Sequence, residues 1–386
     1  MLNCAIIGAG AISSSHIEAY HTLRDRCNLS AMADVNIDRV FEKKQKFALD
    51  FSAYDDYHRI VDDPAIDVVS ICTPPSTHSK MAIECLEAGK HVMVEKPMAL
   101  SLEECDSMID AAVKNGKILA VVAQNRFRTQ FHRVKRLIDS KVAGELLHIA
   151  VNSFFWRGKC YYDLDWRGTW QSEGGGCVLN HAVHFIDLLL WIAGKPEKVV
   201  ALMTNQYHEN SETEDLAEAI LKYADGKLAS ITSSLVHHGE KQGLVFQTER
   251  AGFGVPFSVT ASSSLENGFP KPDALTEELL SEAYRRIEPL QYEGHTGQID
   301  DLISAIENGS ELVSDGYQGR AAIELIMAIY KSASTGQMVA LPLKKGDPFY
   351  TREGALRSVP LFHKKTKSIA GFSVNEITTG GEKFSI

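Results

Sequence analysis

The chain has 386 residues, of which 44% are hydrophobic and 23% are charged, as in an ordinary globular protein. At about 150 residues per domain, this length predicts two or three domains with cores that need no disulfide or metal. The 40 Lys and Arg residues against 50 Asp and Glu residues give a formal net charge of −10. This balance argues against a nucleic-acid partner, because phosphate binding needs a basic surface.

The sequence also indicates the compartment. The N-terminus is apolar from Leu2 onward without a basic segment, so we do not expect a secretory signal. The longest apolar candidate for a membrane span, residues 185–193, is short and contains Asp187. Seven cysteines without a CxxC pair are typical of reduced core thiols. We therefore expect a cytoplasmic protein without a membrane partner.

The first 124 residues alternate between short apolar runs and helical patterns. This alternation predicts a doubly wound parallel sheet of the Rossmann type. The expected strands are 2–7, 28–33, 67–72, 91–95 and 117–123, and the expected helices are 11–23, 40–47, 77–88 and 102–114.

A glycine-rich turn follows the first strand. Gly8 and Gly10 form a GxGxx pattern, with Ser13 in place of a third glycine. Gly8 is expected to make the tight turn and Gly10 to let the backbone approach a pyrophosphate, which the free N–H groups from Gly10 through Ala11 to Ile12 would bind. The alternative is a plain glycine turn without a ligand.

An acidic residue ends the second strand. Asp34 is expected to accept both ribose hydroxyls of an adenosine and to repel a 2′-phosphate, which favours NAD over NADP. Arg39, one helical turn further on, keeps NADP as the weaker alternative. Asp34 could also be a solvated acid at a strand end.

The second half of the chain is expected to contain another sheet. Short alternating runs between residues 198 and 246, with a hairpin signal at Asp225-Gly226, indicate its strands. Residues 258–276 are polar and are expected to form an irregular loop, whereas 295–307 and 320–334 have helical patterns. Residues 344–386 have little apolar periodicity and are expected to be an extension, such as an arm to a neighbouring subunit.

Several motifs together resemble one family. Thr73-Pro74-Pro75 and Glu95-Lys96-Pro97 follow successive strands, and the run EGGGCVLNHAVHFID occupies residues 173–187. With the glycine turn, these resemble the glucose–fructose oxidoreductase, inositol dehydrogenase and MocA (Gfo/Idh/MocA) family over about residues 1–343. The Trp-Arg-Gly-x-Trp stretch at 166–170 resembles the branch with nucleotide-sugar and glycoside 3-dehydrogenases.

The resemblance implies an NAD(P)-dependent oxidoreductase acting on a sugar, cyclitol or related polyol. It implies a Rossmann domain (1–124), a C-terminal α/β domain for substrate binding and oligomerisation with an open, mostly antiparallel sheet (125–343), and an extension (344–386). We expect a homodimer or homotetramer. The expected cofactor contacts beyond the glycine turn and Asp34 are Thr73, Pro74, His78, Glu95, Lys96 and Asn125.

Two side chains are expected to carry the proton chemistry. Oxidising a secondary alcohol needs a group that accepts the hydroxyl proton. Lys96 lies at the carboxyl end of a strand, where partial dehydration and a cationic nicotinamide would lower its pKa. His184 is the second candidate, with a helix-cap histidine as the alternative.

Asn180 lies four residues before His184, so both are expected on one helix face. The resembling enzymes usually have Asp at the position of Asn180. Since an amide cannot accept a proton, Asn180 is expected to orient the substrate hydroxyl, or else to act as a helix N-cap. Lys96 and His184 are therefore the predicted acid–base pair and also substrate contacts.

An aromatic segment, residues 154–170, precedes the glycine run. Trp156, Tyr162 and Arg167 are the expected substrate-binding residues, because aromatic faces pack on sugar C–H surfaces and charged groups bind hydroxyls. The alternative is a packed loop with cation–π contacts. We expect no metal site, since the nearby acids and histidines fan around the helix.

The leading interpretation is an NAD-dependent dehydrogenase of a sugar, glycoside or cyclitol. One alternative is an enzyme that retains NAD and cleaves or epimerises a glycoside through a transient ketone. The other is a regulator that binds NAD and a sugar without turnover.

Overall fold

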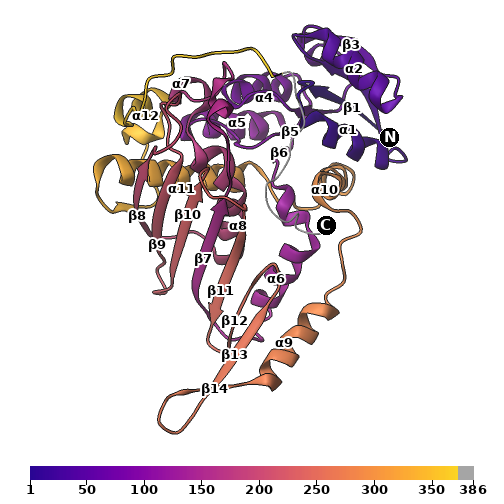
Figure 1. Ribbon diagram of the computed structural model, residues 1–386. Coiled ribbons are helices and arrows are strands. Elements are labelled where there is room, and N and C mark those ends of the chain that lie inside the picture. The colour runs from indigo at the N-terminus through magenta and orange to yellow at the C-terminus, as the bar shows by residue number, and fades with distance from the viewer. Residues whose placement is uncertain (373–386) are drawn as a thin grey trace.

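The computed structural model describes residues 1–372 and contains two sheets (Figure 1). The first is a six-stranded parallel sheet in the order β3-β2-β1-β4-β5-β6. Its strands are β1 (Leu2–Ile7), β2 (Cys27–Ala33), β3 (Ser52–Tyr54), β4 (Val68–Ile71), β5 (His91–Val94) and β6 (Leu119–Val121). This arrangement confirms the doubly wound sheet. The three-residue strand β3 was not expected, because it is too short to carry an apolar pattern.

Helices connect these strands and cover the sheet. They are α1 (Ser13–Thr22), α2 (Ile37–Phe47), α3 (His58–Val61), α4 (His78–Glu87) and α5 (Leu102–Asn115). Helix α5 shows why such segments fold locally: the Ser101 hydroxyl accepts a hydrogen bond from Glu104 N, and Gly116 ends the helix at a φ of 61°.

The second sheet has nine strands in the order β14-β13-β12-β11-β7-β10-β9-β8-β15. Only β7 and β10 pair in parallel, which confirms a mostly antiparallel sheet. Its strands are β7 (Leu146–Phe154), β8 (Lys198–Thr204), β9 (Leu216–Lys222), β10 (Leu228–Ser234), β11 (Gly243–Thr248), β12 (Ala251–Val255), β13 (Val259–Ser264), β14 (Pro270–Pro272) and β15 (Val339–Ala340).

Helices from the second half of the chain complete both cores. They are α6 (Thr129–Asp139), α7 (Trp170–Glu173), α8 (Val183–Ala193), α9 (Ala274–Arg286), α10 (Gly294–Asn308), α11 (Gly316–Thr335) and α12 (Arg352–Ser358). Helices α8 and α11 pack on the second sheet. Helix α10 instead lies against α1, where its apolar residues Ile299, Leu302 and Ile303 join the core beneath β1.

One expectation for the second half is wrong. Residues 258–276 are not an irregular loop: they form β13, β14 and the start of α9, and this polar hairpin projects at the end of the sheet (Figure 1). Its sequence is polar because both strands are largely exposed. Residues of the expected extension 344–386 contact the rest of the chain up to residue 372, and residues 373–386 lie outside the described part of the chain.

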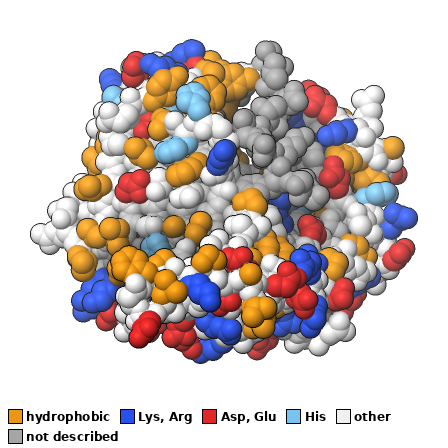
Figure 2. All heavy atoms as spheres, turned by 60° about the horizontal axis from the view of Figure 1, so that its bottom comes forward, with side chains coloured by type: hydrophobic (Ala, Val, Ile, Leu, Met, Phe, Trp, Pro, Cys, Tyr) orange, Lys and Arg blue, Asp and Glu red, His pale blue; other side chains and the backbone are white. Residues whose placement is uncertain are grey.

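The apolar stretch Trp170–Ala193 has a mean hydropathy of 1.5 and by length and composition could cross a membrane, which the sequence analysis did not foresee. However, 72% of its apolar window is buried inside the protein, as in the core helix of a globular domain. The seven cysteines are free thiols, and all except Cys160 are buried. On the face in Figure 2, acidic and basic side chains are interspersed rather than gathered into a basic surface.

Candidate active site

The glycine turn has the geometry of a cofactor cradle. Gly8 has a φ of 102°, and a Cβ there would lie 2.7 Å from the carbonyl carbon and oxygen of Cys72. A Cβ at Gly10 would instead meet no protein atom within 4 Å. Ser13 is fully buried, and its hydroxyl donates to the carbonyl of Gly10 at 2.7 Å. The protein thus needs glycine at position 8 for its own packing, while the open space at Gly10 fits a ligand.

Asp34 joins this turn to the second strand. Its Oδ2 accepts a hydrogen bond from Ala9 N at 2.7 Å, and its Oδ1 accepts one from Asn36 N at 2.9 Å. A carboxylate oxygen has a second lone pair, so both oxygens can still accept a hydroxyl. The backbone N–H groups of Ala11 and Ile12 precede helix α1, where a pyrophosphate would meet the positive end of the helix dipole. These residues fit an NAD molecule.

The expected cofactor role of the His78 side chain is wrong. His78 is 1% exposed, and its ring nitrogens lie 2.9 Å from the carbonyl oxygens of Pro97 and Thr73. Burial lowers the pKa of this imidazole. The ring therefore braces the turn after β4 against the turn after β5, and neither nitrogen is available to a ligand. Thr73 and Pro74 lie in the braced turn, with the Thr73 hydroxyl bonded to Thr77.

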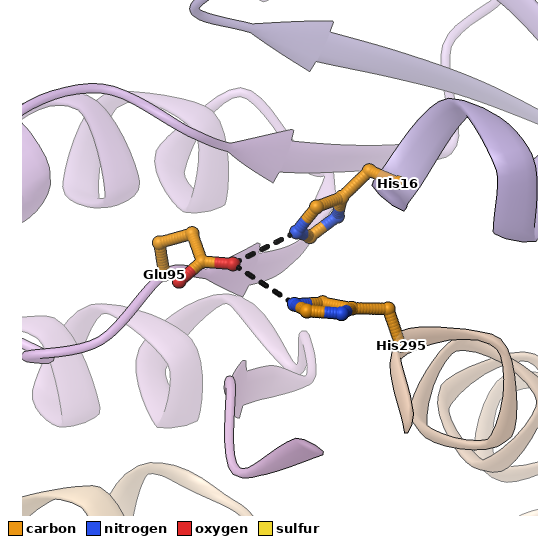
Figure 3. Close-up of side chains that lie close together, drawn as sticks. All are labelled: His16, Glu95 and His295. Atoms are coloured by element: carbon orange, nitrogen blue, oxygen red, sulfur yellow. Dashed lines mark hydrogen bonds and ion pairs between the residues drawn. The ribbon is translucent and has the colours of Figure 1, made fainter. Parts of the chain in front are cut away.

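The Glu95 carboxylate is held by both halves of the chain (Figure 3). His16 Nε2 on α1 donates to its Oε1 at 3.0 Å, and His295 Nε2 on α10 lies 3.4 Å from the same oxygen. The Lys96 backbone N–H donates to Oε2 at 3.2 Å. Burial would raise the pKa of Glu95, but the two imidazoles hold it well below its usual range. This carboxylate is thus held in place by groups of the protein itself, and its expected contact with the cofactor stays a prediction.

These same three side chains could in principle hold a divalent cation. Their ligand atoms lie within 4.8 Å of one another. His16 Nε2 makes a direct hydrogen bond to Glu95 at 3.0 Å. Ser70 in β4 bonds the other ring nitrogen of His16 at 3.1 Å and so fixes the ring. His295 Nε2 is within ion-pair distance of the same carboxylate oxygen but makes no hydrogen bond among the described residues. The cluster acts as a clamp on the residue before Lys96.

Lys96 and His184 line one small cavity of about 20 Å³, together with Asn125 from the turn after β6. Lys96 Nζ donates to the carbonyl of Asn180 at 3.4 Å. Burial lowers the pKa of Lys96, the charge of Glu95 opposes this shift, and the charge of Arg167 adds to it. Burial and the charge of Lys96 hold the pKa of His184 well below its usual value. His184 is therefore neutral at pH 7 and able to accept a proton.

A buried glutamate anchors the segment that carries His184. Glu214 accepts hydrogen bonds from Gly176 N, Val178 N and the Tyr330 hydroxyl at about 3 Å each. A Cβ at Gly176 would lie 1.9 Å from the Glu214 carbonyl oxygen, so this close approach requires glycine. Burial raises the pKa of Glu214 to about 7. The glycine run thus lets the backbone of this segment dock on a carboxyl group.

The helix type changes between Asn180 and His184. Residues Val178–Ala182 form a π-helical turn that continues directly into α8 at Val183, and the shared face of Asn180 and His184 stays a prediction. Asn180 Nδ2 donates to the carbonyls of Gly175 and Gly176 at 2.8 and 3.3 Å. The side chain is therefore a donor that ties down the glycine run, not an N-cap acceptor.

In the aromatic segment, Arg167 is the residue whose charge acts on Lys96. Its guanidinium stacks over the rings of Tyr161 and Trp166, at 4.2 and 3.9 Å from their centroids, and its Nη1 donates to Glu173 at 2.7 Å. The Tyr161 hydroxyl lies 3.3 Å from His181 Nε2. Tyr161 was not predicted as a site residue, because one aromatic residue among many carries no signal of its own.

The other two predicted substrate residues differ in exposure. Trp156 is 38% exposed and stacks on His238, with 5.4 Å between ring centroids. Tyr162 is 1% exposed and packs edge-on against Tyr161 and His208. The ring of Tyr162 therefore belongs to the core and is not an open platform for a sugar.

Two further buried polar residues, Arg126 and Asp187 on helix α8, pair with each other. Arg126 is 3% exposed and donates to both oxygens of Asp187 at 2.7 and 2.8 Å. Arg126 is thus not free to reach a cofactor, and Asp187 is not free to bind a metal. His16, His295 and Glu214 were missed because their partners lie far away in the sequence.

Comparisons with known proteins agree with this geometry. Residues 2–123 match a family described as an oxidoreductase family with an NAD-binding Rossmann fold, and residues 131–253 match the GFO/IDH/MocA C-terminal domain. The chain is 30% identical over 237 residues to myo-inositol 2-dehydrogenase of Thermotoga maritima, which covers 60% of this chain and 68% of that protein. It is 25% identical over 359 residues to D-glucoside 3-dehydrogenase of Escherichia coli, covering 88% and 97%.

A solved structure is similar over most of the chain. The WlbA dehydrogenase from Bordetella pertussis, in complex with NADH and UDP-GlcNAcA, superposes with a TM-score of 0.75 and 28% identity, over 89% of this chain and 99% of that one. Sequence and structure therefore place the chain in the Gfo/Idh/MocA family of NAD-binding oxidoreductases.

Proposed function

We propose that this protein is an NAD-dependent dehydrogenase that oxidises a secondary alcohol of a sugar, glycoside or cyclitol. The observation that carries the proposal is the shared cavity of Lys96 and His184 at the carboxyl ends of the Rossmann strands. Ligands of open α/β sheets bind at this edge. The relatives that bind or act on a nucleotide sugar, a glucoside and an inositol support this substrate class.

The residues divide the proton chemistry between them. Bound NAD supplies the hydride acceptor. Neutral His184 accepts the hydroxyl proton as the substrate carbon becomes a carbonyl, and the Lys96 ammonium stabilises the developing negative charge on the oxygen. In the reverse direction, Lys96 polarises the carbonyl and His184 returns the proton. Asn125 lines the same cavity, and Arg167 and Trp156 orient the rest of the substrate.

A substrate panel tests this proposal. Glycosides, polyols and nucleotide sugars are each mixed with the enzyme and with NAD or NADP, and NADH or NADPH formation is followed by absorbance. We expect turnover with at least one sugar and a preference for NAD, because the Asp34 carboxylate would repel a 2′-phosphate. Binding of NAD without turnover of any substrate would contradict the proposal and favour a regulator. Product formation without net NADH release would indicate a retained cofactor.

We also propose a homo-oligomer assembled through the open face of the second sheet. Ile220 is 55% exposed in the middle of β9, Leu202 is 71% exposed in β8 and Val245 is 40% exposed in β11. An apolar face across several strands is typical of a surface that a partner covers. Light scattering at two concentrations tests this proposal, and an Ile220→Lys variant should yield monomers if it is correct.

A further inference from the structure

The C-terminal segment 359–369 packs against residues 159–170 of the aromatic segment. Ile369 N donates to the carbonyl of Asp163 at 2.7 Å, and Asp165 N donates to the carbonyl of Ile369 at 3.0 Å. Leu164 and Ile369 thereby form a parallel bridge. These contacts are made by residues beyond the part of the chain that the two family models match.

Two lysines of the extension fix the same backbone. Lys365 Nζ donates to the carbonyls of Tyr162 and Leu164 at 2.5 and 2.9 Å, and burial lowers its pKa. Lys367 Nζ pairs with the Asp163 carboxylate at 2.5 Å. Two backbone carbonyls and one carboxylate of the aromatic segment are thus bound by cations from the extension.

Asn210, in the connection between β8 and β9, binds both the aromatic segment and the extension. Its Nδ2 donates to the Tyr162 and Lys367 carbonyls at 3.2 and 2.9 Å. Its Oδ1 accepts from the backbone N–H groups of Thr366 and Lys367 at 2.8 and 3.0 Å. At the other end, Trp170 Nε1 donates to the Pro360 carbonyl at 2.9 Å. The extension therefore holds the aromatic segment at both of its ends.

The aromatic segment also contacts the turn that binds Lys96. Arg167 stacks on Tyr161, whose hydroxyl lies 3.3 Å from His181 Nε2. His181 follows Asn180, whose carbonyl accepts the hydrogen bond from Lys96 Nζ at 3.4 Å. Residues 161–167 thus contact both the extension and the turn that binds Lys96. The position of Arg167 depends on the backbone that Lys365 binds.

We propose that residues 359–369 act as a strap that fixes the Tyr161–Arg167 wall of the sugar site and so determines substrate affinity and selectivity. This proposal rests on the proposed dehydrogenase function. The strap contacts neither Lys96 nor the glycine turn in the described structure, so it acts on substrate binding and not on the proton step or on NAD.

The test compares Lys365→Met with Lys364→Met in the full-length chain. Lys364 is the exposed neighbour and provides a matched control. We expect K365M to raise deuterium uptake in residues 159–170 and to raise the sugar KM about five-fold or more, with kcat and the NAD Kd within two-fold of wild type. K364M should match wild type in deuterium uptake, sugar KM, kcat and NAD Kd. Lys367→Met, at an exposed position, provides a milder second variant if K365M does not fold.

Each outcome decides the proposal. Unchanged deuterium uptake in K365M or K367M would overturn the strap, and faster uptake with an unchanged sugar KM would overturn its role in selectivity. A fall in kcat or in NAD affinity alone would also contradict it. If wild type oxidises no sugar, the proposed function fails separately, and deuterium uptake alone then decides whether the strap exists.

Discussion

The two sides of the active site are built in different ways. The cofactor side is made of backbone: the turn at Gly8 and Gly10, the start of α1 and the strand end at Asp34 lie within 27 residues of one another. The proposed substrate side is made of side chains from segments far apart in the sequence, including the Lys96 turn, the turn after β6 and α8. Backbone-built sites follow from local sequence, whereas side-chain sites depend on the assembled fold.

The largest expected effect is on the substrate side. Lys96→Met should lower kcat about 1,000-fold or more, because it removes the cation that stabilises the developing alkoxide. The NAD Kd should stay within a few-fold of wild type, as measured by fluorescence titration. Lys96→Arg keeps the charge and serves as the control, and it should retain more activity. Near-normal turnover of K96M would contradict the assigned role.

His184→Gln should lower kcat by about 100-fold, since Gln binds a hydroxyl but accepts no proton. The pKa of His184 lies well below its usual value, so its neutral form is already present at neutral pH. Wild-type kcat/KM should therefore fall at acid pH, as the ring becomes protonated, and H184Q should lose this acid limb. A pH profile of both enzymes measures this difference, and an unchanged acid limb in H184Q would assign it to another group.

The cofactor side gives a matched pair of glycine variants. Gly10→Ala should leave the melting temperature unchanged, because its Cβ meets no protein atom, yet weaken NAD binding about ten-fold or more. Gly8→Ala should destabilise the fold by about 1–3 kcal/mol, since it combines a positive φ with a clash against Cys72. Thermal melts with and without NAD separate the two effects. Equal changes in melting temperature and in NAD affinity in the two variants would contradict a structural role for Gly8 and a cofactor-binding role for Gly10.

A smaller effect, on the pH dependence of stability, is expected from Glu214. Its carboxylate binds the backbone just before helix α8, which carries His184. Its pKa rises from an ordinary 4.5 to about 7 on folding, so the folded state holds this proton where the unfolded state has lost it. Stability should therefore fall by about 3 kcal/mol as the pH rises from 4.5 to 7, and Glu214→Gln should lack this fall. Chemical denaturation at several pH values measures it, with Glu87→Gln as an exposed control. The same slope in E214Q and wild type would contradict the assignment.

The sequence was sufficient to predict the two sheets, the glycine turn and the convergence of Lys96 and His184. Each follows from local patterns or from motifs that lie at strand ends. It was not sufficient for the clamp on Glu95, because His16, Glu95 and His295 come from segments up to 279 positions apart. Nor could it predict that Tyr162 is buried or that a π-helical turn precedes α8, since both depend on packing against Glu214 and the strap.

The most direct test of hydride transfer follows the hydrogen itself. The best substrate from the panel is prepared with deuterium on the carbon that bears the reacting hydroxyl and is mixed with the enzyme and NAD. The proposed mechanism predicts reduced cofactor that carries the deuterium, detected by mass spectrometry, and a K96M reaction that forms almost none. Unlabelled NADH from the deuterated substrate, or labelled NADH at the wild-type rate in K96M, would contradict the mechanism.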